Sequence, residues 1–241
     1  MNSTEFQSAF QDLPLVAILR SVTPDEVNAI GEVLVEEGFR LIEVPLISPD
    51  PFTSIERLAR HFGDRVLVGA GTVRTEAQLD QLRDAGGSLM VTPHGDTALI
   101  AAAKRRGLIA MPGETTPTED FAVLDAGADA LKIFPAEAVP PAILRAWRTV
   151  FPPELPLCPT GGVEPEGIAP YVAAGAGGFG LGSGLYKPGF SAAERQSLCP
   201  SLAGREVSED EFKPLRLMNG LYLEIERACH HGTSALDELP A

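Results

Sequence analysis

The chain has 241 residues, of which 44% are hydrophobic, and it carries a formal net charge of −14 at pH 7. This length suits one large domain, and the apolar fraction is ordinary for a protein that buries a core, so disorder is excluded as the main state. The negative charge argues against nucleic-acid binding, because a phosphate backbone is held by clustered Lys and Arg. An anionic substrate must therefore be bound by local cations or by backbone N–H groups.

The sequence contains no membrane-spanning or secretory segment, and its Cys and His residues do not follow the spacing of a disulfide framework or a metal site. No run of about 18 apolar residues could span a membrane, and residues 1–12 contain acidic side chains but no basic stretch of a secretory signal. We therefore expect a cytoplasmic protein with no membrane segment, no disulfide framework and no metal or other cofactor. The side chains that show no ligand spacing are Cys158, Cys199, Cys229, His61, His94, His230 and His231.

Eight short apolar runs recur along the chain, and their first residues are 19 to 26 residues apart. This interval is the length of one strand, one crossover helix and two short loops. The runs are nearly continuous rather than alternating, which indicates parallel strands covered on both faces. The predicted strands are Leu15–Leu19, Leu41–Leu46, Val66–Gly69, Leu89–Thr92, Leu108–Met111, Ala130–Phe134, Leu155–Cys158 and Gly178–Leu181.

The segments between the runs carry helix signals. Residues 23–26, Thr-Pro-Asp-Glu, combine an N-cap, a proline at the first helical position and a capping-box glutamate, and Thr75 and Thr116 begin similar patterns. Glycines predicted to end helices and turn the chain into the next strand are Gly38, Gly63, Gly86, Gly107, Gly127 and Gly175.

Eight strand–helix units with right-handed crossovers predict a closed (β/α)8 barrel over residues 1–198. An open doubly wound sheet fits the same local signals, but the first strand–helix turn has no G-x-G-x-x-G, and eight even units favour closure. Residues 191–198 are expected to form the last helix of the barrel. Residues 199–241 are predicted to be a C-terminal helical extension followed by a frayed tail.

Two predicted strands contain a charge, although burying an unpaired charge costs several kcal/mol. Glu43 lies in the second strand and Lys132 in the sixth. These strands are opposite each other in an eight-strand ring, so the two side chains would converge if both point inward. A desolvated lysine has a lowered pKa and can act as a nucleophile, and a nearby glutamate can transfer protons. The alternative is a structural ion pair, or a lysine that faces the helices.

Polar groups are also expected where other strands end. Arg20 ends the first strand, Thr72 follows the third and Thr160 follows the seventh. An arginine at this edge suits bidentate binding of a carboxylate. Alternatively, Arg20 makes a surface salt bridge and the two threonines cap helices.

Glycine-rich turns follow the seventh and eighth predicted strands. Gly161 and Gly162 form the first turn, and Gly182 and Ser183 lie in the second. These two loops form the usual phosphate site of such barrels, where glycine lets backbone N–H groups approach the anion. Turns also need glycine for their own geometry.

Taken together, six segments resemble the 2-keto-3-deoxy-6-phosphogluconate / 6-phosphogalactonate aldolases, which are class I, Schiff-base aldolases on a (β/α)8 barrel. The similarity runs in order over about three-quarters of the chain. The segments are Leu13–Arg20, Ile42–Pro49, Val68–Val73, Val91–Pro93, Leu131–Pro135 and Phe179–Ser183.

The resemblance implies a role for each matching residue. Lys132 matches the Schiff-base lysine and Glu43 the residue that transfers protons. Other matching positions contact the substrate carboxylate, line the pocket or bind the phosphate; in that order they are Arg20 and Thr72, then Pro93 and Phe134, then Gly161, Gly162, Gly182 and Ser183. The implied ligand is a phosphorylated 2-keto acid, and the implied assembly is a homotrimer.

Within the family, residues 43–46 and 181–189 resemble the phosphogalactonate branch. Two positions depart from it: Ile47 replaces a polar residue, and Thr160 matches the gluconate pattern where the galactonate branch tends to carry valine. The resemblance implies cleavage of 2-dehydro-3-deoxy-6-phosphogalactonate to pyruvate and D-glyceraldehyde 3-phosphate. The gluconate epimer and 4-hydroxy-2-oxoglutarate are alternative substrates. A sugar-phosphate epimerase or isomerase, and a non-catalytic phosphometabolite-binding protein, remain open as alternatives of other classes.

Overall fold

The computed structural model describes residues 3–163, 165–183 and 185–186. Its helices are α1 Ser3–Asp12, α2 Val27–Glu36, α3 Pro51–Phe62, η1 Gly63–Arg65, α4 Glu76–Asp84, α5 Thr97–Arg105, α6 Pro117–Asp125, η2 Ala136–Ala138, α7 Pro141–Arg148 and α8 Pro165–Ala173. Its strands are β1 Leu15–Ile18, β2 Leu41–Pro45, β3 Leu67–Gly71, β4 Leu89–Val91, β5 Ile109–Met111, β6 Gly113–Glu114, β7 Leu131–Ile133, β8 Leu157–Pro159 and β9 Phe179–Leu181.

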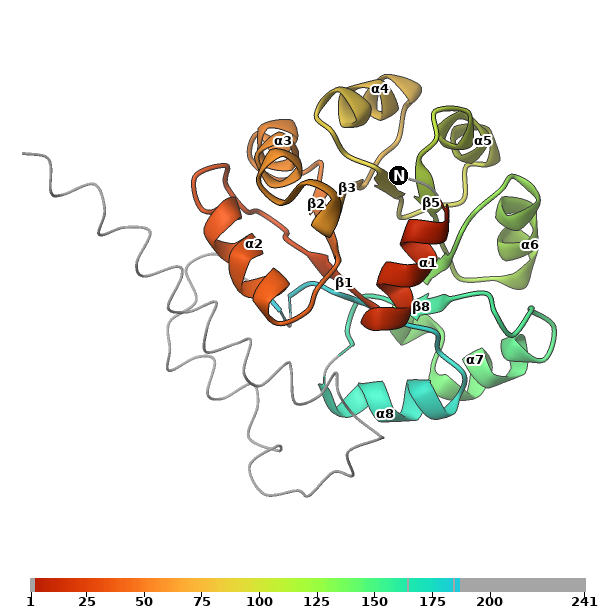
Figure 1. Cartoon of the computed structure of the whole chain (residues 1–241). Coiled ribbons are helices and arrows are strands. Elements are labelled where there is room, and N and C mark those ends of the chain that lie inside the picture. The colour runs from red at the N-terminus through yellow and green to blue at the C-terminus, as the bar shows by residue number, and fades with distance from the viewer. Residues whose placement is uncertain (1–2, 164, 184, 187–241) are drawn as a thin grey trace, which may run out of the picture.

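The strands form a closed parallel barrel. Six of them pair in the order β5-β4-β3-β2-β1-β9, and three pair in the order β6-β7-β8. β5 and β6 are two pieces of one strand, because only Pro112 separates them and a proline has no N–H for the ladder. A bridge between Thr160 and Gly180 and a hydrogen bond from the Gly177 N–H to the Leu157 carbonyl join β8 to β9. The predicted (β/α)8 barrel is confirmed, and the helices surround the strands in Figure 1.

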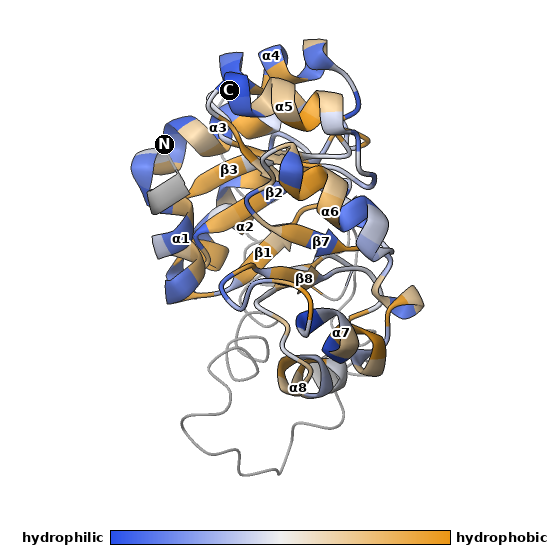
Figure 2. Ribbon diagram, turned by 90° about the vertical axis from the view of Figure 1, so that its right-hand side faces the viewer, coloured by the Kyte–Doolittle hydropathy of each residue, from blue (hydrophilic) through white to orange (hydrophobic). Residues whose placement is uncertain are grey.

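Alternation along each strand divides the core into two parts. Side chains such as Ile42, Val44 and Ile133 belong to the cluster between strands and helices, whereas Leu41 and Ala130 belong to the cluster inside the barrel. Figure 2 shows the strands as the most hydrophobic part of the ribbon. Residues two positions apart on one strand point to the same side of the barrel wall. Glu43 on β2 and Lys132 on β7 each lie two positions after a residue of the interior cluster, so both point into the barrel.

Helix α1 closes the amino-terminal end of the barrel, and the sequence analysis did not predict it. Phe6 and Phe10 are buried, and their rings lie 5.3 Å apart in the interior cluster with Leu41, Leu67 and other strand residues. Figure 1 shows α1 lying across one end of the strand ring. Because this end is closed, a substrate reaches the interior from the carboxyl ends of the strands.

The glycine turns predicted at helix ends are present, but of the three predicted helix starts only that at Thr75 is capped as expected, because Thr116 makes no cap hydrogen bond and Thr23 lies four residues before α2. The six glycines expected after helices all adopt positive φ angles, from 54° at Gly63 to 101° at Gly127. Thr75 caps α4 by accepting a hydrogen bond from the Gln78 N–H. Glu26 accepts a hydrogen bond from the Thr23 N–H at 2.8 Å, although α2 begins only at Val27.

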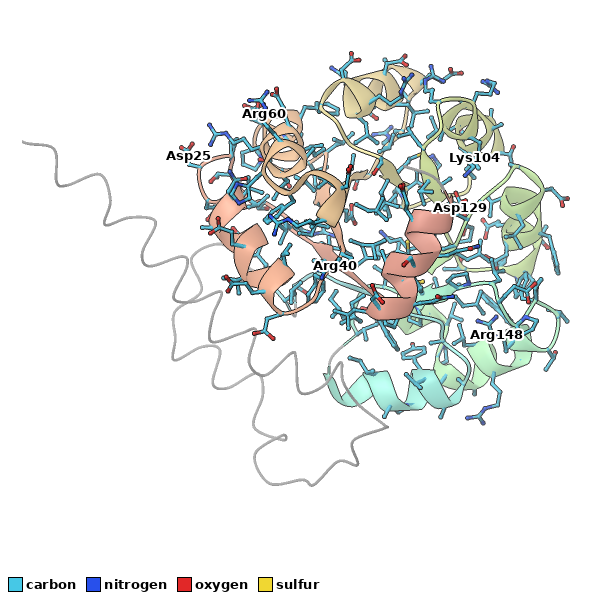
Figure 3. All side chains as sticks on the ribbon, viewed as in Figure 1. Asp25, Arg40, Arg60, Lys104, Asp129 and Arg148 are labelled. Atoms are coloured by element: carbon cyan, nitrogen blue, oxygen red, sulfur yellow. The ribbon has the colours of Figure 1, made fainter. Side chains whose placement is uncertain are left out.

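Polar contacts also hold the outer layer together. Arg148, at the end of α7, donates hydrogen bonds to the carbonyls of Pro152, Leu155 and Gly175, and it lies at the lower right in Figure 3. In the described part of the chain no helix has the length and apolar character needed to cross a bilayer. The predicted helix at 191–198 and the extension at 199–241 lie outside the described residues.

Candidate active site

Lys132 and Glu43 both lie inside the barrel. The side chains of Lys132 and Glu43 are 7% and 1% exposed. The residues on either side of each in the strand pack against the helices outside the barrel; these are Leu131 and Ile133, and Ile42 and Val44. β2 and β7 are separated by β3, β4 and the β5–β6 strand, so they are opposite strands of the ring. The structure therefore brings an amine and a carboxyl group into one apolar interior.

Burial changes the protonation of both groups. Desolvation lowers the pKa of Lys132, an effect that the carboxylate of Glu43 opposes, and it raises the pKa of Glu43, an effect that the Lys132 ammonium opposes. No direct ion pair between Lys132 and Glu43 is present among the contacts of the described residues, although the charge of each group affects the pKa of the other. A lowered pKa makes the neutral, nucleophilic form of a lysine more accessible, and a raised pKa makes a glutamic acid a better proton donor.

The Glu43 carboxyl group packs against Gly71 of the neighbouring strand β3. β2 and β3 pair with Glu43 opposite Gly69 and with Pro45 opposite Gly71. A Cβ atom at position 71 would overlap the Glu43 carboxylate. Gly71, at the end of β3, thus makes room for the carboxyl group inside the barrel.

Arg20 and Thr72 follow β1 and β3 at the open end. Arg20 is exposed, and its positive charge opposes the rise in the pKa of Glu43 and adds to the fall in the pKa of Lys132. Thr72 and Ser21 have positive φ angles of 60° and 64°, which are uncommon for residues with side chains and concentrate at functional sites. Arg20 therefore presents a positive charge to the same interior as the two buried groups.

Pro93 follows β4 and Phe134 follows β7, and the β5–β6 strand lies between these two strands. The Phe134 ring centroid is 4.8 Å from the Lys132 Nζ atom, and the ring also lies against the backbone of Gly161. Pro93 packs against Gly113, where a Cβ atom would come within 3.3 Å of the proline Cα. An aromatic ring over the amine excludes water from one side of Lys132 and adds to its desolvation.

Thr160 is buried at the end of β8. Its hydroxyl donates to the carbonyl of Cys158 at 3.1 Å, and it packs against Gly180 of β9. The hydroxyl hydrogen is therefore already donated to a backbone carbonyl, whereas the hydroxyl oxygen can still accept a hydrogen bond from a substrate hydroxyl.

Gly161, Gly162, Gly182 and Ser183 lie in the loops after β8 and β9. Gly161 and Gly162 have φ angles of 86° and 64°, a conformation that side chains rarely adopt. At the second loop, the N–H groups of Leu185 and Tyr186 both donate to the Gly182 carbonyl, so a helical turn begins at Gly182. The loops meet through the Thr160–Gly180 bridge.

The sequence analysis missed two buried polar groups near this end. Ser48 accepts a hydrogen bond from the Ser21 N–H at 3.0 Å and so ties the loop after β2 to the loop that carries Arg20. Glu114 of β6 is 3% exposed, and neither of its carboxyl oxygens has a hydrogen-bond partner among the described residues. Burial and the neighbouring carboxyl group of Asp120 raise the pKa of Glu114 to about 9. A charged residue three positions after the apolar run 108–111 was the available signal.

The chain is similar to known aldolases over most of its length. The family model for the KDPG and KHG aldolases matches residues 6–196. The probable 2-dehydro-3-deoxy-6-phosphogalactonate aldolase of Rhizobium meliloti (strain 1021) is 47% identical over 80% of this chain and 92% of that protein. The 2-dehydro-3-deoxy-6-phosphogalactonate aldolase of Escherichia coli (strain K12) is 44% identical over 74% of this chain and 87% of that protein.

A solved structure described as native KDPGal superposes with a TM-score of 0.74 at 36% identity, and it covers 92% of this chain and 97% of its own. The family match spans the strands that carry Glu43 and Lys132 and the loops after β8 and β9. The chain belongs to the KDPG and KHG aldolase family and is an aldolase, a carbon–carbon lyase.

Proposed function

We propose that this chain is a Schiff-base aldolase that cleaves 2-dehydro-3-deoxy-6-phosphogalactonate to pyruvate and D-glyceraldehyde 3-phosphate. The observation that carries the proposal is Lys132, an amine with a lowered pKa, buried opposite Glu43 inside a barrel that opens at the other end. The names of the two relatives at 47% and 44% identity support this substrate.

The chemistry follows from these two groups. The neutral Lys132 amine attacks the C2 ketone, and Glu43 donates the proton that lets hydroxide leave as water, which forms an iminium. Glu43, now a carboxylate, takes the proton of the C4 hydroxyl. The C3–C4 bond breaks, its electron pair moves into the iminium to give an enamine, and the aldehyde leaves. Protonation of C3 and addition of water then release pyruvate and restore the Lys132 amine.

The two ends of the substrate are assigned to different loops of the opening, the carboxylate to those after β1 and β3 and the phosphate to those after β8 and β9. Arg20, with Thr72, binds the carboxylate, because a guanidinium offers two parallel donors to it. Pro93 and Phe134 form apolar walls around the reacting carbons. The loops that contain Gly161, Gly162, Gly182 and Ser183 bind the phosphate through backbone N–H groups. This assignment leaves Lys132 and Glu43 at the centre.

The presence of a threonine at position 160 supports the gluconate epimer as a second substrate. Its buried hydroxyl oxygen can accept a bond from a substrate hydroxyl of one configuration, which a valine could not do. Ile47 is 62% exposed at the open end and supplies no polar contact to the carboxylate. An epimerase would instead use Glu43 as a base with Lys132 as an electrostatic group, and a binding protein would use neither group chemically.

Borohydride reduction in the presence of pyruvate separates these possibilities. We expect the wild-type protein to gain one covalent pyruvate adduct on Lys132, located by peptide mass spectrometry. Lys132→Ala should give no adduct while it keeps the wild-type circular dichroism spectrum. Lys104→Arg is the matched control, because it removes an amine that pairs with Asp129 on the outside of the barrel but keeps the charge. Labelling of Lys132→Ala at the wild-type level would refute the assignment.

We infer that the chain assembles as a homotrimer, the state that the family resemblance implies. Large apolar side chains that are exposed on or beside the last three described helices are candidates for contacts between subunits. These are Phe121 on α6, Ile143 on α7, Val150 after α7 and Val172 on α8. Light scattering coupled to size-exclusion chromatography should give three times the mass of one chain, and a monomeric mass at micromolar concentration would contradict this inference.

A further inference from the structure

The hydroxyl of Tyr171 joins α8 to the segment that follows the strand of Lys132. The Tyr171 side chain is buried, and its hydroxyl lies 2.9 Å from the Ala136 carbonyl oxygen and 3.2 Å from the Val139 carbonyl oxygen. One O–H group is therefore shared between two carbonyls at the η2 turn. Burial, together with the charge of Glu137, raises the pKa of this hydroxyl, so it stays protonated and continues to donate at neutral pH.

The η2 turn is also bonded to the loop after β8. The Ala136 N–H donates to the Thr160 carbonyl at 2.9 Å. Ala136 is thus held through its N–H by Thr160 and through its carbonyl by Tyr171. The bond from Tyr171 joins residues 35 positions apart in the sequence, so it exists only because α8 packs against η2.

The Phe134 ring lies between this turn and the reacting amine. Its centroid is 4.8 Å from the Lys132 Nζ atom, and a Cβ atom on Gly161 would come within 3.2 Å of the ring. Phe134 precedes Ala136 by only two residues, so a shift of the η2 turn would move the ring. The Tyr171 hydroxyl is therefore connected to Lys132 through a short series of packed and bonded groups.

We propose that Tyr171 is a positioning residue for the nucleophile: by fixing the η2 turn, its hydroxyl holds the Phe134 ring over Lys132. This inference rests on the proposed function, because it concerns the attack of the Lys132 amine on the substrate ketone. Tyr171 acts through Phe134, which keeps water from one side of the amine.

The effect on Lys132 follows from the exclusion of water. Desolvation is the largest cause that lowers the pKa of Lys132; the charge of Arg20 adds to it, whereas Glu43 and Glu114 oppose it. A ring that moves away would admit water and let this pKa rise, so less of the lysine would be neutral at a given pH. Removing the Tyr171 hydroxyl leaves these three charged groups in place, so a change at Lys132 would report its exposure to water.

The test is Tyr171→Phe, which removes the hydroxyl but keeps the ring that packs against Phe179. The rate of pyruvate adduct formation is followed by borohydride trapping as a function of pH. We expect the rate at pH 7 to fall about 10-fold, an effect of the size expected for one buried hydrogen bond. The pH of half-maximal rate should rise by about one unit, which corresponds to a tenfold smaller neutral fraction. The circular dichroism spectrum should stay that of wild type.

Thr149→Val is the matched control. It also removes a side-chain hydroxyl that donates to a backbone carbonyl, that of Ala146 at 2.7 Å, but at the exposed end of α7. This variant should keep the wild-type pH profile. An equal shift in Thr149→Val would indicate a general loss of stability and would overturn the role of Tyr171.

A double-variant cycle tests whether Tyr171 acts through Phe134. Phe134→Leu removes the ring and should raise the pH of half-maximal rate by itself. Adding Tyr171→Phe to this variant should cause little further change, because the ring that the hydroxyl positions is already gone. Two shifts that add would show that Tyr171 affects Lys132 by another route and would contradict the proposal.

An unchanged pH profile in Tyr171→Phe would also overturn the proposal, even if the melting temperature falls, because a hydroxyl with only a structural role changes stability alone. Pyruvate trapping on wild type separates this failure from failure of the proposed function. A wild-type protein that forms no adduct would overturn both proposals, whereas a wild-type adduct with an unshifted profile in Tyr171→Phe would overturn only the role of Tyr171.

Discussion

The carboxyl group of Glu43 occupies the space where a side chain at Gly71 would begin. The two residues lie on neighbouring strands, β2 and β3, and both face the interior of the barrel. Gly71 therefore leaves room for the carboxyl group to which we assign proton transfer in the proposed mechanism. Its φ angle is not in the left-handed region, so this glycine is required for space and not for backbone conformation.

We expect Gly71→Ala to lower kcat at least 10-fold and to change KM much less, because the added methyl group displaces the Glu43 carboxyl group from Lys132. General acid–base catalysis contributes about 10²- to 10⁴-fold, so misplacing this group should cost a large part of that factor. Steady-state kinetics and the pH profile of kcat provide the measurement.

Gly167→Ala is the control for this substitution, since nothing lies within 4 Å of the Cβ position on that glycine of α8. The control should behave as wild type. A Gly71→Ala protein with wild-type kcat and an unchanged pH profile would show that Glu43 does not depend on this space.

Ser48 connects the loop after β2 to the loop that carries Arg20, the residue to which we assign the substrate carboxylate. Its hydroxyl oxygen accepts a bond from the Ser21 N–H at 3.0 Å, and Ser21 follows Arg20 with a φ angle of 64°. Ser48→Ala should raise KM for substrate about 3- to 10-fold and leave kcat near wild type, because loss of one hydrogen bond costs about 1 kcal/mol and frees the Arg20 loop. Ser48→Thr keeps the hydroxyl and should restore KM. A fall in kcat with constant KM would place Ser48 outside carboxylate recognition.

The strand repeat was predictable from the sequence because each strand is covered on both faces and is apolar throughout. All eight predicted runs overlap strands of the barrel, with shifts of one or two residues at their ends, as at 155–158, where β8 is Leu157–Pro159. Lys132 and Glu43 stood out for the same reason: a charge inside an apolar run is costly unless the fold uses it.

Other features depend on contacts between distant segments and could not be predicted from local pattern. Helix α1 carries few apolar residues, and its Phe6 and Phe10 gain stability only by closing the barrel interior. Tyr171 and Ser48 are ordinary polar residues in the sequence, and only the packing of one segment on another connects them to the site. The split between β5 and β6 follows from Pro112, which the apolar run 108–111 did not reveal.

Glu114 should make the stability of the protein fall as the pH rises. Its pKa is about 9 in the folded protein against an ordinary value of 4.5, so between these values the unfolded chain has released the proton that the folded protein keeps. Raising the pH therefore favours unfolding, by at most about 1.4 kcal/mol per pH unit. Asp120, whose pKa is raised by burial to about 7, acts in the same direction below that pH.

Glu114→Gln removes this linkage while it keeps the shape of the side chain. The melting temperature of the variant relative to wild type should increase steadily from pH 5 to pH 8. Glu154→Gln, which alters an exposed carboxylate, should show the same difference from wild type at every pH. If the Glu114→Gln difference is also independent of pH, the Glu114 carboxyl group titrates normally and the prediction fails.

Thr160→Val should lower kcat/KM for the gluconate epimer more than for the galactonate epimer. The Thr160 hydroxyl donates to the Cys158 carbonyl, which orients its oxygen as an acceptor for a substrate hydroxyl. A site that bonds a hydroxyl discriminates between epimers because the wrong one leaves a buried polar group unpaired. Valine of similar volume keeps the packing against Gly180 but offers no acceptor. Thr160→Ser keeps the hydroxyl and should retain the wild-type ratio of the two kcat/KM values. An equal loss on both epimers in Thr160→Val would assign the hydroxyl to packing of the β8–β9 junction and remove it from substrate recognition.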